Sequence, residues 1–323
     1  MKITNENLDC AIVSFYMHNV CNFKCSYCLP HHYNGDQRWP EETKSYLKFI
    51  DKVLETNKHI YIETFGGEPT LWPKLNDFVE EIQSLDVYVE VTTNASRTLK
   101  YFDKFRSEKC FFLLSWHYES IDDDHFFNVA KLLSEKNVPI HIPILVVPQN
   151  YKRARKLFER FKESNLNVDV IPKFVRINIG SDEYFEYTTE QKDWITNNYI
   201  LKRHPFQVNW EIPHHLHFDD KKIYWSELTN DGLHKFEDWT CTAGLSRFFI
   251  EPDGTILKCS KGWKLNKGIV GNIFGEYTMP TTPIRCNLKS CPCKMDALVE
   301  KWSTPSNVDT SLKTFLEQRE MHS

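Results

Sequence analysis

Short apolar runs alternate with segments of helical periodicity along the first part of the chain. The apolar runs predict six strands, at Ala11–Met17, His59–Phe65, Val87–Thr93, Lys109–Trp116, Pro139–Val147 and Val168–Val175. Apolar residues three and four positions apart predict helices between them, at Glu41–Glu55, Pro73–Leu85, Asp122–Lys136 and Tyr151–Ser164. This alternation is typical of α/β proteins with a parallel sheet, and right-handed crossovers would curl six such units into a partial (β/α)6 barrel of the TIM type.

The pattern changes after residue 180. A further helix is predicted at Thr188–Leu201, and residues 205–240 show no regular period. Short apolar runs, glycine turns and cysteines dominate from Cys241 onward, and Ile250–Cys259 predicts a hairpin around Asp253 and Gly254. The sequence therefore predicts a core barrel over residues 1–180, a connecting segment over 181–240, a small cysteine-rich α+β extension over 241–300 and a C-terminal helix over 301–323.

Composition and charge narrow the functional class. The 323 residues carry a formal net charge of −4, which argues against tight binding of nucleic acid as the main function. The main basic run, Tyr151–Lys162, is predicted to be the solvated face of a surface helix, with Leu157, Phe158 and Phe161 turned inward. The N-terminal sequence is polar and no apolar run reaches the length of a membrane span, so we expect a cytoplasmic protein without a membrane partner.

Eight of the ten cysteines fall in two groups. The first is CNFKCSYC, with Cys21, Cys25 and Cys28, and the second contains Cys241, Cys259, Cys286, Cys291 and Cys293. Because cytoplasmic thiols stay reduced, this clustering favours metal binding over disulfide bonds. The two remaining cysteines, Cys10 and Cys110, lie beside apolar runs and are predicted to be small buried residues.

The three thiols of the first group leave a four-coordinate metal ion one ligand short. A structural zinc site requires four closed ligands, whereas a [4Fe–4S] cluster held by three cysteines keeps one iron open for a small molecule. The loop follows the first predicted strand, so we expect it at the carboxyl-terminal mouth of the barrel, where the active sites of such folds lie. The spacing therefore favours an iron–sulfur cluster with an open site over zinc.

The spacing CxxxCxxC, with Tyr27 before its last cysteine, resembles the signature of the radical S-adenosylmethionine (SAM) superfamily. Three further motifs follow successive predicted strands, as they do in that family: GGEP at Gly66–Pro69, TTN at Thr92–Asn94 and LSWH at Leu114–His117. Ala95 stands where the family often has glycine. The resemblance implies SAM contacts from Tyr27, Gly66, Gly67, Glu68, Asn94, Ser115 and His117, and an iron–sulfur cluster on Cys21, Cys25 and Cys28.

The same resemblance implies a mechanism. SAM would bind the open iron through its amino and carboxylate groups, and an electron from a flavodoxin- or ferredoxin-type donor would cleave it to methionine and a 5′-deoxyadenosyl radical. That radical would abstract hydrogen from a substrate, and the cluster would make the enzyme oxygen-sensitive. The implied substrate is a peptide or a small molecule, with a nucleobase of DNA or RNA as the alternative. No catalytic acid or base is identifiable from the sequence.

The second cysteine group resembles the twitch and SPASM extensions of the same superfamily, which hold auxiliary iron–sulfur clusters. Cys241 and Cys259 enclose the pattern C-x12-G-x4-C, and GIVGNIFGE at Gly268–Glu276 is similar to a Gly-Asn-Ile stretch of these extensions. The group has five cysteines, fewer than a full SPASM extension. The resemblance therefore implies one auxiliary [4Fe–4S] cluster of twitch type, ligated by four of the five and without an open iron. The spacing does not indicate which cysteine is spare.

Two alternatives stay open at this point. A structural zinc ion suits a cysteine-rich hairpin region equally well. For the whole chain, a non-catalytic iron–sulfur protein or a zinc-stapled binding protein is the alternative class, although neither accounts for GGEP at Gly66–Pro69 or for the strand–helix repeats. Arg247 and Lys258 flank the second group and are expected at the solvated surface, with contact to an anionic substrate as the alternative.

Overall fold

The computed structural model divides into two compact units that interleave along the chain. The residues described are 1–4, 10–35, 39, 43–85, 87–105, 110–177, 183–200, 215–224, 228, 232–291 and 293–303. The barrel unit comprises Phe15–Thr43 and Ile62–Asn209, and the C-terminal unit comprises Met1–Ser14, Lys44–Tyr61 and Trp210–Ser323. The domain boundaries predicted at residues 180, 240 and 300 stay predictions.

The barrel unit is built from alternating strands and helices. Its strands are β2 (Cys10–Tyr16), β3 (His59–Phe65), β4 (Val87–Thr93), β5 (Cys110–Leu114), β6 (Ile140–Val146) and β7 (Asp169–Phe174), and its helices are α2 (Leu75–Gln83), α3 (Leu99–Phe102), α4 (Asp123–Glu135), α5 (Tyr151–Glu163) and α6 (Thr189–Asn197). The boundary between the units passes through β2 and β3, of which residues 15–16 and 62–65 belong to this unit.

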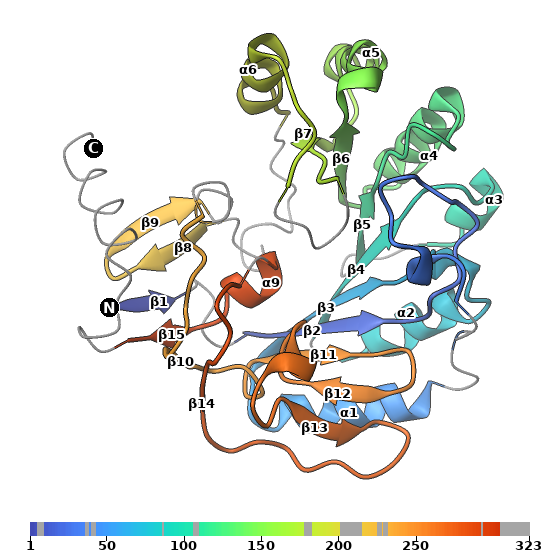
Figure 1. Cartoon of the computed structure of the whole chain (residues 1–323). Coiled ribbons are helices and arrows are strands. Elements are labelled where there is room, and N and C mark those ends of the chain that lie inside the picture. The colour runs from blue at the N-terminus through green and yellow to red at the C-terminus, as the bar shows by residue number, and fades with distance from the viewer. Residues whose placement is uncertain are drawn as a thin grey trace. The chain divides into compact units, whose positions relative to one another are not determined.

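These strands follow one another in the sheet in their sequence order, from β2 to β7. The registered pairs from β4 to β7 are all parallel. Figure 1 shows α3 to α6 along the outer side of these strands. The predicted α/β fold with a partial (β/α)6 barrel is confirmed, and its strands lie close to their predicted bounds.

The helices of this unit form because their apolar residues share one face. In α5 the side chains of Leu157, Phe158 and Phe161 are buried, while most of the basic residues of the helix are exposed. This arrangement confirms the inward face predicted for the basic run, and each buried side chain contributes about 1.5–3 kcal/mol. Helix α4 begins after Asp122, whose carboxylate accepts a hydrogen bond from the His125 amide at 2.8 Å.

The C-terminal unit contains a six-stranded sheet and a smaller antiparallel group of strands. Its strands are β1 (Lys2–Thr4), β8 (His215–Phe218), β9 (Lys221–Tyr224), β10 (Thr240–Cys241), β11 (Arg247–Ile250), β12 (Thr255–Leu257), β13 (Ile269–Asn272), β14 (Ile284–Arg285) and β15 (Lys301–Trp302), and its helices include α1 (Lys44–Leu54) and α9 (Lys294–Ala297). The six-stranded sheet has the order β14-β10-β15-β1-β8-β9, and its registered pairs are antiparallel.

The predicted hairpin is present as β11 and β12, which pair antiparallel. Gly254 adopts φ +83° in its turn, and Asp253 Oδ1 accepts a hydrogen bond from the Thr255 amide at 2.9 Å. Strand β13 extends the hairpin by pairing with β12. Helix α1 packs against this group, with the Phe49 and Phe248 rings edge to face at 5.4 Å between centroids.

Several expectations need correction. The segment predicted to be irregular over residues 205–240 contains the hairpin of β8 and β9, whose four-residue strands are too short to show a period. Helix α6 ends at Asn197, before the predicted Leu201, because Ile200 instead pairs with Val170. Cys110 is buried as predicted, whereas Cys10 is only half-buried.

Residues 304–323 of the predicted C-terminal helix lie outside the described residues, and its first two positions form strand β15 instead. Within the described part of the chain, no helix combines the length and apolar character that crossing a bilayer requires.

Candidate functional site

The three cysteines of the first group lie in the loop that follows β2. Cys25 is buried, and Cys21 and Cys28 are half-buried. The Cys28 amide donates to the Cys25 carbonyl oxygen at 3.0 Å, and the Phe23 amide donates to Cys21 Sγ at 3.3 Å. The backbone of the loop therefore holds the thiols in a compact turn.

These thiols are protonated at neutral pH. Burial raises the pKa of Cys21 to about 12 and that of Cys28 to about 11, and it also raises the pKa of Cys25. Because the thiolate is the form that binds metal, a metal ion that bound these cysteines would displace their protons.

Tyr27 and His117, both predicted to contact SAM, meet each other beside Cys25. The Tyr27 hydroxyl lies 2.9 Å from His117 Nδ1, and the two rings stack with their centroids 6.1 Å apart. The same Nδ1 lies 3.6 Å from Cys25 Sγ. Burial lowers the pKa of His117 to about 4 and raises that of Tyr27, so both side chains are neutral at pH 7. The pair thus links the end of β5 to the middle of the cysteine loop.

A carboxylate that the sequence analysis did not identify also holds this loop. Glu119 accepts hydrogen bonds from the Ser26 amide at 2.8 Å and from the Ser26 hydroxyl at 2.5 Å. The Tyr118 hydroxyl donates to the same carboxylate at 2.8 Å. Burial raises the pKa of Glu119, but the hydrogen bonds from Ser26 and Tyr118 outweigh that effect and lower it. Nothing in the local sequence distinguishes Glu119 from a surface acid.

The two glycines of GGEP allow a close approach of two backbone segments. The Gly67 amide donates to the His18 carbonyl oxygen at 2.7 Å, and the Glu68 amide donates to the Val20 carbonyl oxygen at 2.9 Å. A Cβ atom would lie 2.4 Å from the His18 oxygen at Gly66 and 2.0 Å from the Val20 oxygen at Gly67. The glycines therefore position the segment that leads into Cys21. The Gly67 and Glu68 amides already have hydrogen-bond partners within the protein.

Glu68 is a buried anchor between this turn and the end of β4. Its carboxylate accepts four hydrogen bonds, from the Thr70 amide and hydroxyl, the Thr93 hydroxyl and the Asn94 amide, at 2.5–3.1 Å. Burial raises the pKa of Glu68, while these donors favour its ionised form. Ser115, also predicted to contact SAM, lies beside the end of β4. Its amide donates to the Thr93 carbonyl oxygen at 2.8 Å.

Asn94 lies close to the first cysteine. Its Nδ2 is 3.9 Å from Cys21 Sγ and donates to Asn22 Oδ1 at 3.0 Å. Ala95, which follows it, adopts φ +58°, the left-handed conformation that the glycine common at this position would adopt without strain. The turn after β4 therefore keeps the shape expected of a glycine turn.

Four of the five cysteines of the second group line one cavity in the C-terminal unit. These are Cys241, Cys259, Cys286 and Cys291, whereas Cys293 precedes α9 and does not line the cavity. The Cys286 amide donates to the Trp239 carbonyl oxygen, and the Cys291 amide donates to the His234 carbonyl oxygen, both at 2.8 Å. These bonds tie the later cysteines to the segment that precedes Cys241.

Arg247 and Lys258 are buried, which corrects the expectation of a solvated surface for both. Arg247 is buried because Asp296 accepts from its Nε at 2.8 Å and the Ser14 hydroxyl accepts from its Nη1 at 2.8 Å. Asp296 also accepts from the Ser260 hydroxyl at 2.5 Å. Arg247 and Asp296 both line the cysteine cavity.

Lys301, which the sequence analysis did not identify, lines the same cavity. Its Nζ donates to the carbonyl oxygens of Asp296, Ala297 and Val299 at 3.0, 2.9 and 2.6 Å. Burial raises the pKa of the Cys241, Cys286 and Cys291 thiols, and the Lys301 charge opposes that rise. Among the described residues, no three His, Cys, Asp or Glu side chains come close enough together to hold a single metal ion.

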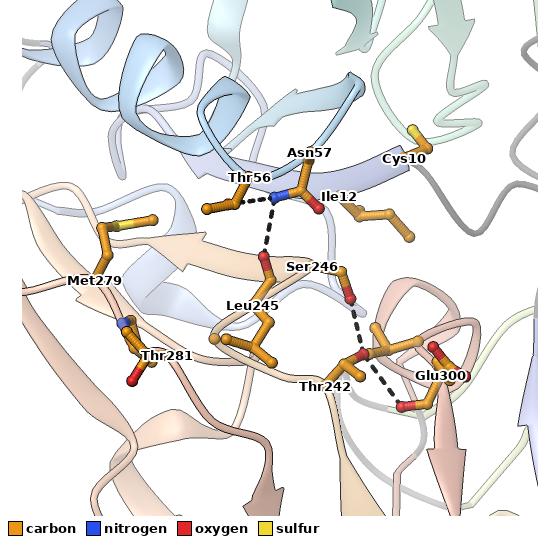
Figure 2. A pocket seen from close by; sticks show the side chains of 13 residues that line it. Cys10, Ile12, Thr56, Asn57, Thr242, Leu245, Ser246, Met279, Thr281 and Glu300 are labelled. Atoms are coloured by element: carbon orange, nitrogen blue, oxygen red, sulfur yellow. Dashed lines mark hydrogen bonds between the residues drawn. The ribbon is translucent and has the colours of Figure 1, made fainter.

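A second cavity of about 420 Å³ lies in the same unit, and Figure 2 shows Thr242 and Glu300 among the residues that line it. The Thr242 amide and hydroxyl both donate to the Glu300 carbonyl oxygen, at 3.0 and 3.2 Å. Thr242 and Ser246 share a hydroxyl hydrogen bond of 2.8 Å. These bonds fix the pairing of β10 with β15.

Residues 15–187 match the family model described as the radical SAM superfamily, and this match spans more than half of the chain. The chain belongs to the radical SAM superfamily. The predicted family and the prediction that the protein is a radical SAM enzyme are thereby confirmed.

Relatives of this radical SAM enzyme fall into two sets. GTP 3′,8-cyclase of Mannheimia succiniciproducens is 30% identical over 123 residues, which cover 35% of this chain and 34% of the cyclase. Streptococcus suis SuiB bound to S-adenosylmethionine has a TM-score of 0.55 at 16% identity and covers 84% of this chain and 66% of SuiB. Native anSMEcpe with bound AdoMet and Cp18Cys peptide has a TM-score of 0.51 at 18% identity, covering 83% of this chain and 78% of anSMEcpe.

These similarities cover limited parts of the relatives and of this chain. The chain spans only about a third of the cyclase, and at these identities the solved structures share the fold alone. The match to the superfamily ends at residue 187, so the second cysteine group lies beyond it. The family match therefore covers neither the second cysteine group nor the substrate of this radical SAM enzyme.

The buried carboxylate of the radical SAM barrel gives a direct test of how the site is held. We expect Glu68→Gln to lower the free energy of unfolding by about 1–3 kcal/mol, because the glutamine nitrogen would face a hydrogen-bond donor. Thermal unfolding of the protein before iron reconstitution measures this change. Glu135→Gln, at an exposed position on α4, is the matched control and should shift the melting temperature little. Equal shifts in the two variants would show that Glu68 is no anchor.

Proposed function

We propose that this radical SAM enzyme holds its SAM cluster on Cys21, Cys25 and Cys28 and a second [4Fe–4S] cluster on four cysteines of the C-terminal unit. The observation that carries the proposal is the cavity lined by Cys241, Cys259, Cys286 and Cys291. When bound, the SAM cluster supplies the electron that cleaves SAM and so yields a radical able to abstract hydrogen from a substrate.

The residues of the barrel unit fit a role in shaping the SAM site. Tyr27 and His117 hold Cys25 from one side, and Glu119 fixes Ser26 between the cysteines. Asn94 borders Cys21. Neutral His117 offers a hydrogen-bonding group without adding charge next to the cluster. We propose Tyr27, Gly66, Gly67, Glu68, Asn94, Ser115 and His117 as the SAM site, with Glu68 acting through the turn and strand end that it joins.

The second cluster is proposed to be of twitch type and fully ligated by protein. Four thiolates complete the ligand set of a [4Fe–4S] cluster, so no iron is left open for a substrate. Cys293 is the spare cysteine in this proposal because it does not line the cavity. A fully ligated cluster suits electron transfer or a structural role better than direct binding of substrate.

We propose a peptide as the substrate. The solved structures that support this are SuiB bound to precursor peptide SuiA and anSMEcpe bound to a peptide, whose likeness covers 83% of this chain. The second candidate is a nucleotide. Its support is the sequence similarity to the GTP 3′,8-cyclase of Mannheimia succiniciproducens, which covers 35% of this chain. A low-potential flavodoxin- or ferredoxin-type donor, a cytoplasmic location and sensitivity to oxygen complete the proposal.

The experiment compares the two substrate classes on one preparation. Anaerobically reconstituted enzyme is supplied with SAM, dithionite and either GTP or peptides translated from short reading frames beside its gene. We expect 5′-deoxyadenosine to form in proportion to a mass change in one peptide. Stoichiometric 5′-deoxyadenosine with a modified GTP, and none with any peptide, would replace the peptide by a nucleotide substrate.

A further inference from the structure

The inference concerns the lysine opposite Cys241. Cys241 and Lys301 are register partners in the antiparallel pair of β10 and β15. Directly opposed residues of such a pair have their Cβ atoms about 4.5–5.5 Å apart and project to the same side of the sheet. Both residues line the cavity with the other three cysteines. Lys301 therefore lies in the wall of the cavity that the four cysteines line.

The charged side chains that line the cavity differ in whether an opposite charge compensates them. Arg247 and Asp296 form a buried ion pair at 2.8 Å, so their charges compensate each other. Lys301 is only 2% exposed. Among the described residues, its hydrogen-bond partners are the backbone carbonyl oxygens of Asp296, Ala297 and Val299, which precede β15. Its Nζ also lies 5.0 Å from the centre of the Phe236 ring. A buried ammonium that has only neutral partners carries a large desolvation cost unless an anion lies near it.

Four cysteine thiolates around a [4Fe–4S] cluster supply that anion. The oxidised cluster with its thiolates is already negative, and reduction adds one more negative charge. A fixed positive charge at the cavity wall stabilises the reduced form more than the oxidised form, and burial limits the screening of this effect by water. Lys261 also lines the cavity but is half-buried and donates to the Ser290 hydroxyl, so water screens its charge more.

We propose that Lys301 sets the reduction potential of the auxiliary cluster, holding it above the value that the four thiolates alone would give. The proposal rests on the proposed function, because it requires the second cluster. It makes Lys301 a tuning residue, since no bond to iron is involved.

The test uses the full chain with Cys21→Ala, Cys25→Ala and Cys28→Ala, so that the auxiliary cluster alone contributes to the signal. Lys301→Met is compared with its parent by redox titration followed by electron paramagnetic resonance. We expect at least a tenfold lower ratio of reduced to oxidised cluster at a fixed potential, which for one electron corresponds to about 59 mV. Lys301→Arg should restore most of the parental value.

The controls separate tuning from structure. Lys2→Met removes the same charge from β1 of the same sheet, where the side chain is 49% exposed, and should leave the potential unchanged. Lys301→Gln, which keeps a donor for the carbonyl oxygens, gives a second neutral variant should Lys301→Met load iron poorly. A merely structural lysine would change iron content or melting temperature without moving the potential, and parental potentials in both neutral variants would overturn the tuning role. A parent that binds no iron at all, or binds zinc, would instead refute the auxiliary cluster itself.

Discussion

Alanine at Cys21, at Cys25 or at Cys28 will each reduce the formation of 5′-deoxyadenosine from SAM to the background of the reductant. In the proposed SAM site each cysteine supplies one of three thiolates to the cluster, and no other cysteine of the described chain lies in that loop. The measurement is anaerobic reconstitution with iron and sulfide, followed by dithionite and chromatography of the nucleoside.

The matched control for this series is Cys10→Ala, because Cys10 is half-buried and belongs to neither cysteine group. It should keep the iron content and the turnover of the parent. If any of the three ligand variants cleaved SAM at the parental rate, the assignment of that cysteine to the cluster would be wrong.

The second large effect is expected in the C-terminal unit. Alanine at Cys241, Cys259, Cys286 or Cys291 should lower the iron content from about eight to about four atoms per chain, since each variant removes one ligand of a four-iron cluster. Cys293→Ala should keep about eight. Iron analysis of the five purified variants measures the difference.

Cys293→Ala is the matched control of this series, because Cys293 lies only two residues from Cys291 but does not line the cavity. Loss of iron in Cys293→Ala equal to that in Cys291→Ala would contradict the choice of spare cysteine. One equivalent of zinc in place of the second four irons would favour the structural zinc alternative.

The barrel unit was the predictable part of the fold. Its strands are apolar runs of five to seven residues separated by amphipathic helices, so local periodicity is enough to locate them. The cysteine loop was predictable for a related reason, because its three thiols lie within eight consecutive residues. Tyr27 and His117 were both identified, but their hydrogen bond to each other depends on how β5 lies against the loop.

The C-terminal unit resisted prediction because its contacts are distant in sequence. Strands β10, β14 and β15 contain two residues each and carry no periodic signal. Arg247 and Lys301 look like ordinary surface cations until Asp296 and the carbonyl oxygens near it are placed beside them. The spare cysteine was hidden for the same reason, since Cys291 and Cys293 differ in where the fold puts them and not in spacing.

The pairing of β1 with β15 has a consequence for how the protein is made. Lys2 pairs with Trp302, so β1 has no partner on that side until the ribosome has released residue 302. Closing so long a loop is slow compared with forming the local crossovers of the barrel unit. Lys301 and Cys241 also meet only at that stage. The cavity proposed for the auxiliary cluster is therefore complete only after residue 301 has been made, whereas the loop of Cys21, Cys25 and Cys28 is made early.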